Sequence, residues 1–194
     1  MDDFSSSDNR LRPTARLTAV HPQNGPSEYS LDAKSFPALH KAIEVLKQES
    51  GISSYSFVIL GDRFGGAGTD FKRRVVGIGI GKLNTLSYDA ILAVIGHEFG
   101  HIFRHERPNE PAIGRLLPAL TRVQFEEVEA DRFSVCLVGK AANLTALTSG
   151  NNSDSKFPIS LRVEAVDDFS FTDCPNLKHP RKIDSKVNGK SLTK

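Results

Sequence analysis

The segment from Ser87 to His105 reads SYDAILAVIGHEFGHIFRH and carries the clearest helical pattern in the chain. It opens with a serine and has Asp89 in its first turn. Both are typical of a helix start, because a hydroxyl caps the first amides and a carboxylate suits the positive end of the helix dipole. Apolar residues then recur at positions 91, 95, 99 and 102. The pattern predicts a helix from Ser87 to about His105 with one side packed into a core.

Two histidines lie four residues apart in this helix, in the string His97-Glu98-Phe99-Gly100-His101. Four residues rise about 6 Å, so both imidazoles project from one helix face and can reach a single metal ion. Glu98 follows the first of them directly and is a candidate general base. In a chain of this composition the pattern arises by chance with a probability of about 1%, so a second signal is required.

The second signal is the acidic string Glu126-Glu127-Val128-Glu129-Ala130-Asp131. It lies in another predicted helix, from about Leu120 to Gly139. A solvated acidic face is the usual meaning of such a cluster. Apolar residues surround this one, however, and indicate a largely buried helix: Phe125, Val128, Phe133, Val135, Leu137 and Val138. Since a buried carboxylate requires a partner of opposite charge, the string favours a cation site.

The acidic string has two separable sides. Glu127 and Asp131 are four residues apart and share one helix face, whereas Glu126 and Glu129 share another. Catalytic zinc takes three protein ligands and keeps a fourth position for water, and Glu127 fits as the third ligand. Asp131 is one turn further on, where a carboxylate can accept the other ring N–H of a ligating histidine.

His105 is a rival ligand, four residues beyond His101. It is eight residues from His97, or about 12 Å along the helix axis, so the three histidines cannot share one ion. We therefore expect His105 at the surface, and we assign no role to His21 or His40.

The remaining segments predict an α+β domain with a small sheet. Ser35 can cap a helix whose apolar residues recur at positions 36, 39, 43 and 46, with Gly51 just past its end. Strands are expected at 54–60 and 74–80, with a glycine-rich turn at 64–68 between them. A short helix is expected near 141–147. Residues 1–30 are interpreted as a flexible arm, 31–184 as the folded domain and 185–194 as a tail.

The composition of the chain argues against two classes of partner, nucleic acids and membranes. The net charge of +2 gives no reason to expect a nucleic acid. The longest strictly apolar stretch, Ile91–Ile95, is too short to span a bilayer, so no membrane insertion is expected. The acidic, polar first residues do not read as a secretory leader, and the default location is the cytoplasm. Cys136 and Cys174 are accordingly interpreted as reduced thiols.

Taken together, His97-Glu98-x-x-His101 and Glu127-x-x-Ala130-Asp131 resemble the gluzincin metallopeptidases, in particular the HtpX-like and CAAX-prenyl protease family. The resemblance covers about residues 35–184 and implies a zincin-like core, with a small sheet packed on the active-site helix and on a second ligand-bearing helix. His179-Pro180 is similar to the family's C-terminal His-Pro segment. No membrane-spanning helices are expected here, so the chain looks like a minimal soluble version. The ImmA/IrrE-type proteases have a similar layout, but Asp131 favours the first group.

The sequence thus predicts a zinc-dependent endopeptidase that acts on peptide or protein substrates. One Zn²⁺ would be held by His97, His101 and Glu127, with Glu98 as general base and acid. His179 is the candidate donor to the developing oxyanion, and Tyr88 is the alternative. Substrate is expected to add as an extended strand beside residues 75–80.

Two other functions stay open at this stage. The chain could be a catalytically silent zinc-binding module that recruits a partner, or a precursor inhibited by its N-terminal arm. The sequence alone does not name the substrate or the oligomeric state.

Overall fold

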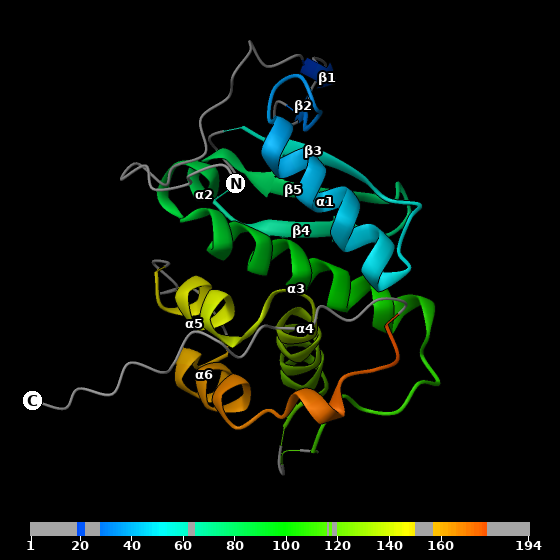
Figure 1. Ribbon diagram of the computed structural model, residues 1–194, viewed down its shortest axis with the longest axis vertical. Helices are drawn as coiled ribbons and strands as arrows, with labels where there is room; N and C mark the ends of the chain where they lie inside the picture. The colour runs from blue at the N-terminus through cyan, green and yellow to red at the C-terminus, as the bar shows by residue number, and fades with distance from the viewer. Residues whose placement is uncertain are drawn as a thin grey trace, which may run out of the picture.

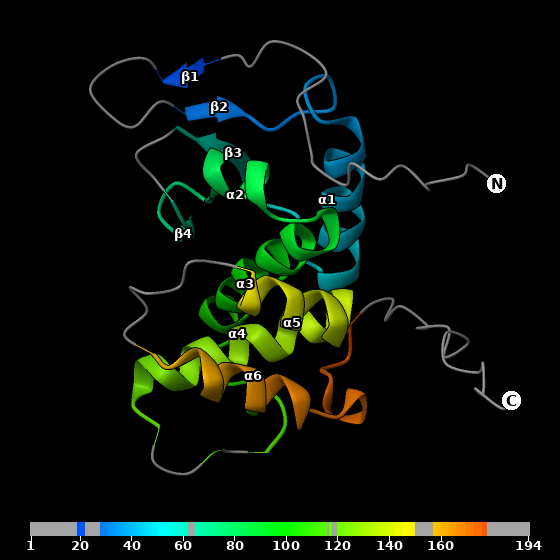
Figure 2. The same cartoon turned by 90° about the vertical axis from the view of Figure 1, so that its left-hand side faces the viewer.

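The computed structural model describes residues 19–21, 28–61, 65–115, 117, 120–149 and 157–177. The protein has an α+β architecture in which one long helix, α3 (Tyr88–Glu106), runs through the middle. A sheet and α1 (Pro37–Ser50) lie on one side of α3, and helices α4 (Arg122–Val138), α5 (Lys140–Thr148) and α6 (Ile159–Asp167) lie on the other (Figures 1 and 2). Helix α3 is therefore shared by both halves of the molecule.

The sheet has five strands in the order β1-β2-β3-β5-β4. Their bounds are Ala19–His21 (β1), Glu28–Ser30 (β2), Ser56–Leu60 (β3), Ala67–Asp70 (β4) and Val75–Gly79 (β5). The pair β3–β5 is parallel and the other neighbours are antiparallel. Strands β3 and β5 confirm the two strands expected from the sequence. Strand β5 is paired on both sides, so β4 forms the edge of the sheet next to α3.

Two expectations about this half were wrong. Strands β1 and β2 fall in the stretch interpreted as a flexible arm. Residues without a periodic pattern of their own are ordered there because β2 pairs with β3 and β1 pairs with β2. Strand β4 falls partly in the stretch interpreted as a turn, because Ala67 and Gly68 pair with β5. The rest of the arm and the whole tail at 185–194 lie outside the described residues.

The expected helices are present with small shifts at their ends. Ser87 caps α3 by accepting from the amide of Ala90, as predicted. The residue that precedes α1 is Phe36, not Ser35 as expected, and the side chain of Phe36 makes no cap hydrogen bond. At its other end, α1 is followed by Gly51 in the left-handed conformation that glycine adopts readily. The sequence reading did not anticipate α2 (Ile80–Thr85), α6 or the short 3-10 helix η1 (Phe171–Asp173).

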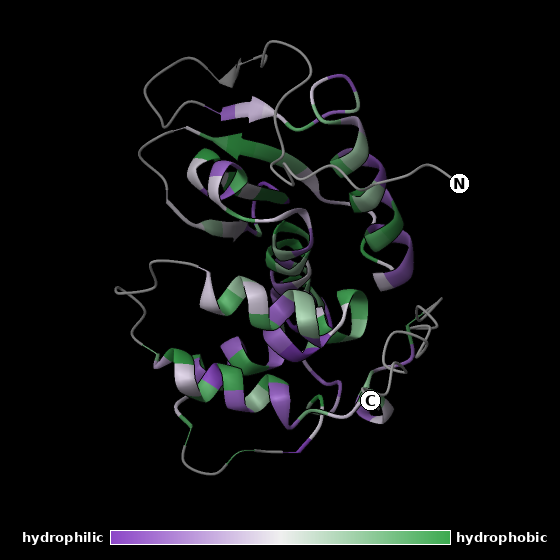
Figure 3. Cartoon of the chain, turned by 60° about the vertical axis from the view of Figure 1, so that its left-hand side comes forward, coloured by the Kyte–Doolittle hydropathy of each residue, from purple (hydrophilic) through white to green (hydrophobic). Residues whose placement is uncertain are grey.

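The core extends from the sheet and α1 across α3 to α4, α5 and α6. The apolar side predicted for α3 is fully buried, with 0% exposure at Ile91, Ile95, Phe99 and Ile102. Phe99 meets Phe57 of β3 edge to face, with ring centroids 5.6 Å apart. Figure 3 shows hydrophobic residues gathered on β3 and along α3, whereas α1 alternates between hydrophobic and hydrophilic residues. Within the described ranges, no helix combines the length and apolar character needed to cross a bilayer.

Helices α3 and α4 approach each other closely because small residues meet at their crossing. A Cβ atom on Gly100 would lie 2.4 Å from the Cα atom of Ala130, and one on Gly96 would lie 2.5 Å from the Oγ atom of Ser134. Ser134 also donates a hydrogen bond of 2.8 Å to the carbonyl of Ala93. This contact sets the distance between the two helices that carry the predicted metal ligands.

The interpretation of the cysteines as reduced thiols was wrong. Cys136 of α4 and Cys174 form a disulfide, with Cα atoms 5.7 Å apart. The chain after α6 folds back through η1 to α4 and so brings the two cysteines together. A separation of 38 residues in the sequence does not predict this contact. Because disulfides persist mainly in oxidising compartments, the cysteines do not support the cytoplasmic location expected above.

Candidate metal centre

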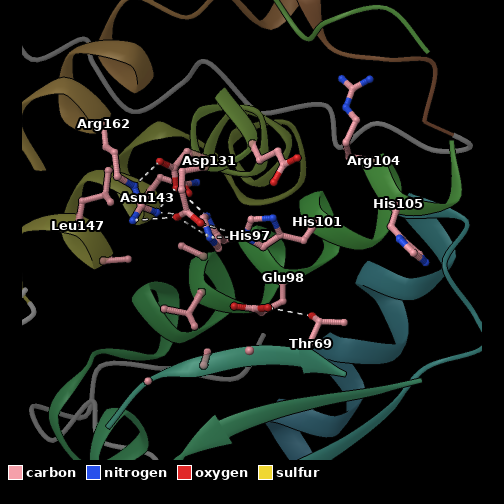
Figure 4. A pocket seen from close by; sticks show the side chains of 18 of the residues that line it. Thr69, His97, Glu98, His101, Arg104, His105, Asp131, Asn143, Leu147 and Arg162 are labelled. Carbon is pink, nitrogen blue, oxygen red and sulfur yellow. Dashed lines mark hydrogen bonds and ion pairs between the residues drawn. The ribbon is translucent and has the colours of Figure 1, made fainter. Parts of the chain in front are cut away.

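Three side chains converge where α3 faces α4 (Figure 4). The Nε2 atoms of His97 and His101 are 3.0 Å apart. Each lies 3.5 Å from a carboxylate oxygen of Glu127. Ligand atoms of a tetrahedral zinc site, with bonds of about 2.0–2.1 Å, are about 3.3 Å from one another. The three residues named from the sequence thus lie together as a group that could hold a metal ion, at a spacing compatible with zinc.

Asp131 lies behind this cluster. Its Oδ1 atom accepts a hydrogen bond of 2.8 Å from Nδ1 of His97, and the side chain is only 2% exposed. This bond places the ring proton on Nδ1 and leaves the lone pair of Nε2 directed toward His101 and Glu127. Asp131 thus occupies the orienting position expected for it, and His97 is the histidine that it orients.

Arg162 of α6 completes the cluster and was not singled out in the sequence. Its Nε and Nη2 atoms each donate a bond of 2.7 Å to one oxygen of Asp131, in a two-pronged arrangement. Its Nη1 atom lies 3.3 Å from Glu127. One guanidinium therefore holds both carboxylates. Nothing in the sequence marked it, because α6 shows only a weak pattern and its arginine is one of 25 basic residues.

The two histidines have opposite protonation tendencies. Burial alone would lower the pKa of His97, but the charge and hydrogen bond of Asp131 outweigh it and raise that pKa to about 9. Burial and the neighbouring charge of His97 lower the pKa of His101 to about 4. In the absence of a metal, the pair therefore carries one positive charge, because His97 holds a second ring proton, and a bound cation would take the place of that proton.

The carboxylate of Glu127 is ionised at neutral pH. Burial would raise its pKa, but the hydrogen bond and charge of His97, together with Arg162, lower it. A negatively charged oxygen beside two imidazole nitrogens is the donor set of a catalytic zinc site rather than of a calcium or magnesium site, which would use oxygens throughout.

Glu98 lies beside the ligand cluster and points toward Thr69 of β4 (Figure 4). Thr69 of β4 donates a hydrogen bond of 2.8 Å to its Oε2 atom. Glu98 is 5% exposed, and burial raises its pKa, which brings it nearer to the range in which a carboxylate exchanges protons at neutral pH. The sequence reading missed Thr69, because its strand was not expected.

These side chains line one cavity of about 980 Å³. The floor along one side is Gly66 and the β4 residues from Ala67 to Thr69, and the opposite wall comes from α4, α5 and α6. Phe71 and the exposed His105 stack with centroids 4.2 Å apart at one end. His105 is thus at the surface as predicted, on the rim rather than at the ligand cluster.

The other predicted site features have different outcomes. His179 lies outside the described residues, so its role stays a prediction. Tyr88 is nine residues from His97, about 13 Å along the helix, and its hydroxyl donates to the carbonyl of Ala38, so it is not placed to reach the cluster. The strand at 75–80 cannot receive a substrate, because β5 is already paired on both sides.

A scan against protein-family models gives no match to this chain, and neither does a search of curated proteins or of solved structures. The assignment of the site therefore rests on its own geometry.

Proposed function

We propose that this protein is a zinc-dependent endopeptidase with a zincin-like core of the gluzincin type. The observation that carries the proposal is the arrangement of His97, His101 and Glu127 around one point at the spacing of a tetrahedral zinc site. A buried carboxylate, Glu98, lies in the same cavity. A structural zinc site would be closed by four protein ligands, whereas three ligands beside a large cavity leave room for water and substrate.

When bound, zinc lowers the pKa of a coordinated water to about 7 and polarises a substrate carbonyl. The chain supplies the proton transfers. Glu98 accepts a proton from the attacking water and returns it to the leaving nitrogen, so that the peptide bond breaks into a carboxyl and an amino group. Thr69 fixes one oxygen of Glu98 and so limits the orientations of that carboxylate.

Substrate binding is proposed along β4. Its residues from Ala67 to Thr69 line the cavity together with Glu98 and the ligand cluster, and Thr69 contacts Glu98 directly. An extended peptide can add to such an edge through main-chain hydrogen bonds, which select for extended chains more than for particular side chains. This moves the expected substrate strand from residues 75–80 to the neighbouring edge strand.

The test compares the native protein with Glu98→Gln. We expect both to bind one zinc per chain, measured by elemental analysis after dialysis. Cleavage of casein or of a quenched fluorescent peptide library should fall by about 10²- to 10⁴-fold in the variant, because proton transfer is lost while the ligands remain. Glu164→Gln, on an exposed part of α6, is the matched control and should cleave like the native protein.

Two results would contradict the proposal. If the native protein binds no zinc, the ligand assignment is wrong. If it retains zinc and cleaves nothing in the library, the alternative of a catalytically silent zinc-binding module is favoured instead.

A further inference from the structure

A lysine lies in the cavity beside the proposed metal centre and has no role in the chemistry described above. Lys82 is on α2, which follows β5 directly. The amide of Gly79 donates a bond of 2.7 Å to the carbonyl of Gly66, so the start of α2 is held at the start of β4. Lys82 therefore stands at the Gly66 end of the cavity, and Phe71 and His105 stand at the opposite end.

Each of the three arginines among the described residues that line the cavity has an acidic partner. These pairs are Arg104 with Glu129, Arg122 with Glu126, and Arg162 with Asp131. In the part of the chain that the structure describes, the side chain of Lys82 forms neither a hydrogen bond nor an ion pair. Among the described residues that line the cavity, the ammonium group of Lys82 is thus a cation without an acidic partner.

The surroundings make this arrangement unfavourable without an anion. Lys82 is half-buried, and burial lowers its pKa, with a further contribution from the charge of Arg162. The carboxylate that attracts Lys82, Glu98, is already hydrogen-bonded to Thr69 and is assigned to proton transfer. A divalent cation at His97 would add more positive charge to the same cavity. An incoming anionic group would offset both.

We infer that Lys82 binds a substrate carboxylate near the scissile bond, at the Gly66 end of the cavity, and so gives the proposed peptidase a preference for acidic peptides. This inference rests on the proposed function. The carboxylate has two possible sources, an Asp or Glu side chain or the C-terminus of the peptide. Both present the same oxygens to an ammonium group.

The experiment starts from a quenched fluorescent peptide that the native protein cleaves. Each position near the scissile bond is changed in turn to Glu, Gln or Lys, and the C-terminus is either free or amidated. We expect kcat/KM for the Glu peptide to exceed that for the Gln peptide by about tenfold at one position, as for a charge-assisted hydrogen bond. A difference confined to free against amidated peptides would identify the terminal carboxylate as the source.

Variants then assign the preference to Lys82. Lys82→Met should bring the ratio of kcat/KM for Glu and Gln peptides close to one, whereas Lys82→Arg should keep it. Lys82→Glu should reverse the preference in favour of the Lys peptide, a gain that a folding defect cannot produce. Lys41→Met, on an exposed part of α1, is the control and should keep the native ratio. An unchanged ratio in all three Lys82 variants would overturn the inference.

A binding measurement separates this inference from the proposed function. The Glu98→Gln protein, loaded with zinc, is titrated with fluorescein-labelled Glu and Gln peptides and followed by fluorescence anisotropy. If the native protein cleaves nothing but Glu peptides bind more tightly and the difference disappears with Lys82→Met, the carboxylate site stands without the peptidase. If cleavage occurs and Lys82 changes neither binding nor selectivity, the peptidase stands without the carboxylate site.

Discussion

Helix α4 carries two buried clusters of acids and arginines on opposite sides. Only one of them, the Asp131 cluster, includes side chains that could bind a metal ion. On one side, Glu129 is 2% exposed and pairs with Arg104. On the other, Asp131 is 2% exposed and pairs with Arg162. Both arrangements neutralise a buried carboxylate with a guanidinium, so charge and burial alone do not distinguish them.

The Glu129 cluster is closed. Its two oxygens accept the amide of Ile113 at 3.0 and 2.9 Å, as well as the guanidinium of Arg104. Arg132 donates to the carbonyls of Ile113 and Arg115. All these partners belong to α3, to α4 or to the segment between them. This cluster fixes the connection from α3 to α4, and its acid, Glu129, is used entirely by these partners.

The Asp131 cluster is open because it includes imidazoles. Asp131 uses its oxygens on Arg162 and on Nδ1 of His97, which leaves Nε2 of His97 facing Nε2 of His101 beside Glu127. A histidine transmits the orientation imposed on one nitrogen to the lone pair of the other. Burial and charge pairing of an acid therefore do not by themselves indicate a functional site. The informative feature at Asp131 is that its partner His97 has a second ring nitrogen, Nε2, which lies beside two further candidate ligands.

Glu129→Ala should give the largest change in stability. It leaves Arg104 and Arg132 buried without their acid, and we expect the free energy of unfolding to fall by about 3–5 kcal/mol. Denaturant unfolding followed by circular dichroism measures this change. The folded fraction should keep its zinc affinity. A large loss of zinc affinity without a loss of stability would show that the two sides of α4 are not independent.

Gly100→Ala tests the contact on which the metal cluster depends. The added Cβ atom would meet the backbone of Ala130, and overpacking of this kind costs about 1–3 kcal/mol. Since α4 must move away from α3, zinc affinity should fall together with stability. Gly81→Ala, where a Cβ atom meets nothing within 4 Å, is the control. Equal effects of the two substitutions would contradict the close-contact explanation.

Arg162→Gln should weaken zinc binding by about 10- to 100-fold, the usual effect of losing a group that orients a ligand. The reason is that Asp131 loses its two-pronged partner and no longer fixes the ring of His97. Competition with a chelator of known affinity measures the change. Arg162→Lys should not restore binding, because a lysine cannot span both carboxylate oxygens. Full rescue by lysine would reduce the role of Arg162 to charge alone.

Arg122→Gln should have the smallest effect. Arg122 pairs with Glu126 on the exposed side of α4, and such pairs contribute about 0.3–0.5 kcal/mol. Unfolding free energy should change by no more than that, and zinc affinity should remain native. A larger effect would mean that the surface pair helps to hold the ligand helix.

The site residues that lie on one helix at a regular spacing could be predicted from the sequence. The positions of His97 and His101 follow from a four-residue interval, and the separation of Glu127 from Glu129 follows from the geometry of one helix. Arg162, Thr69 and the pairing of Cys136 with Cys174 could not be predicted from it. Each depends on a segment whose place is set by tertiary packing: α6, the glycine-rich edge strand β4, and the return of the chain through η1.

The bond between Cys136 and Cys174 makes a covalent ring of the chain that contains α5 and α6. The proposed peptidase activity would extend to other copies of the chain, and a single nick within the ring would leave both fragments attached. Such a molecule would migrate as an intact chain in a non-reducing gel and separate into two bands only after thiol treatment. Arg162 is carried on the ringed segment, so it would stay tethered to the ligand helix after the nick.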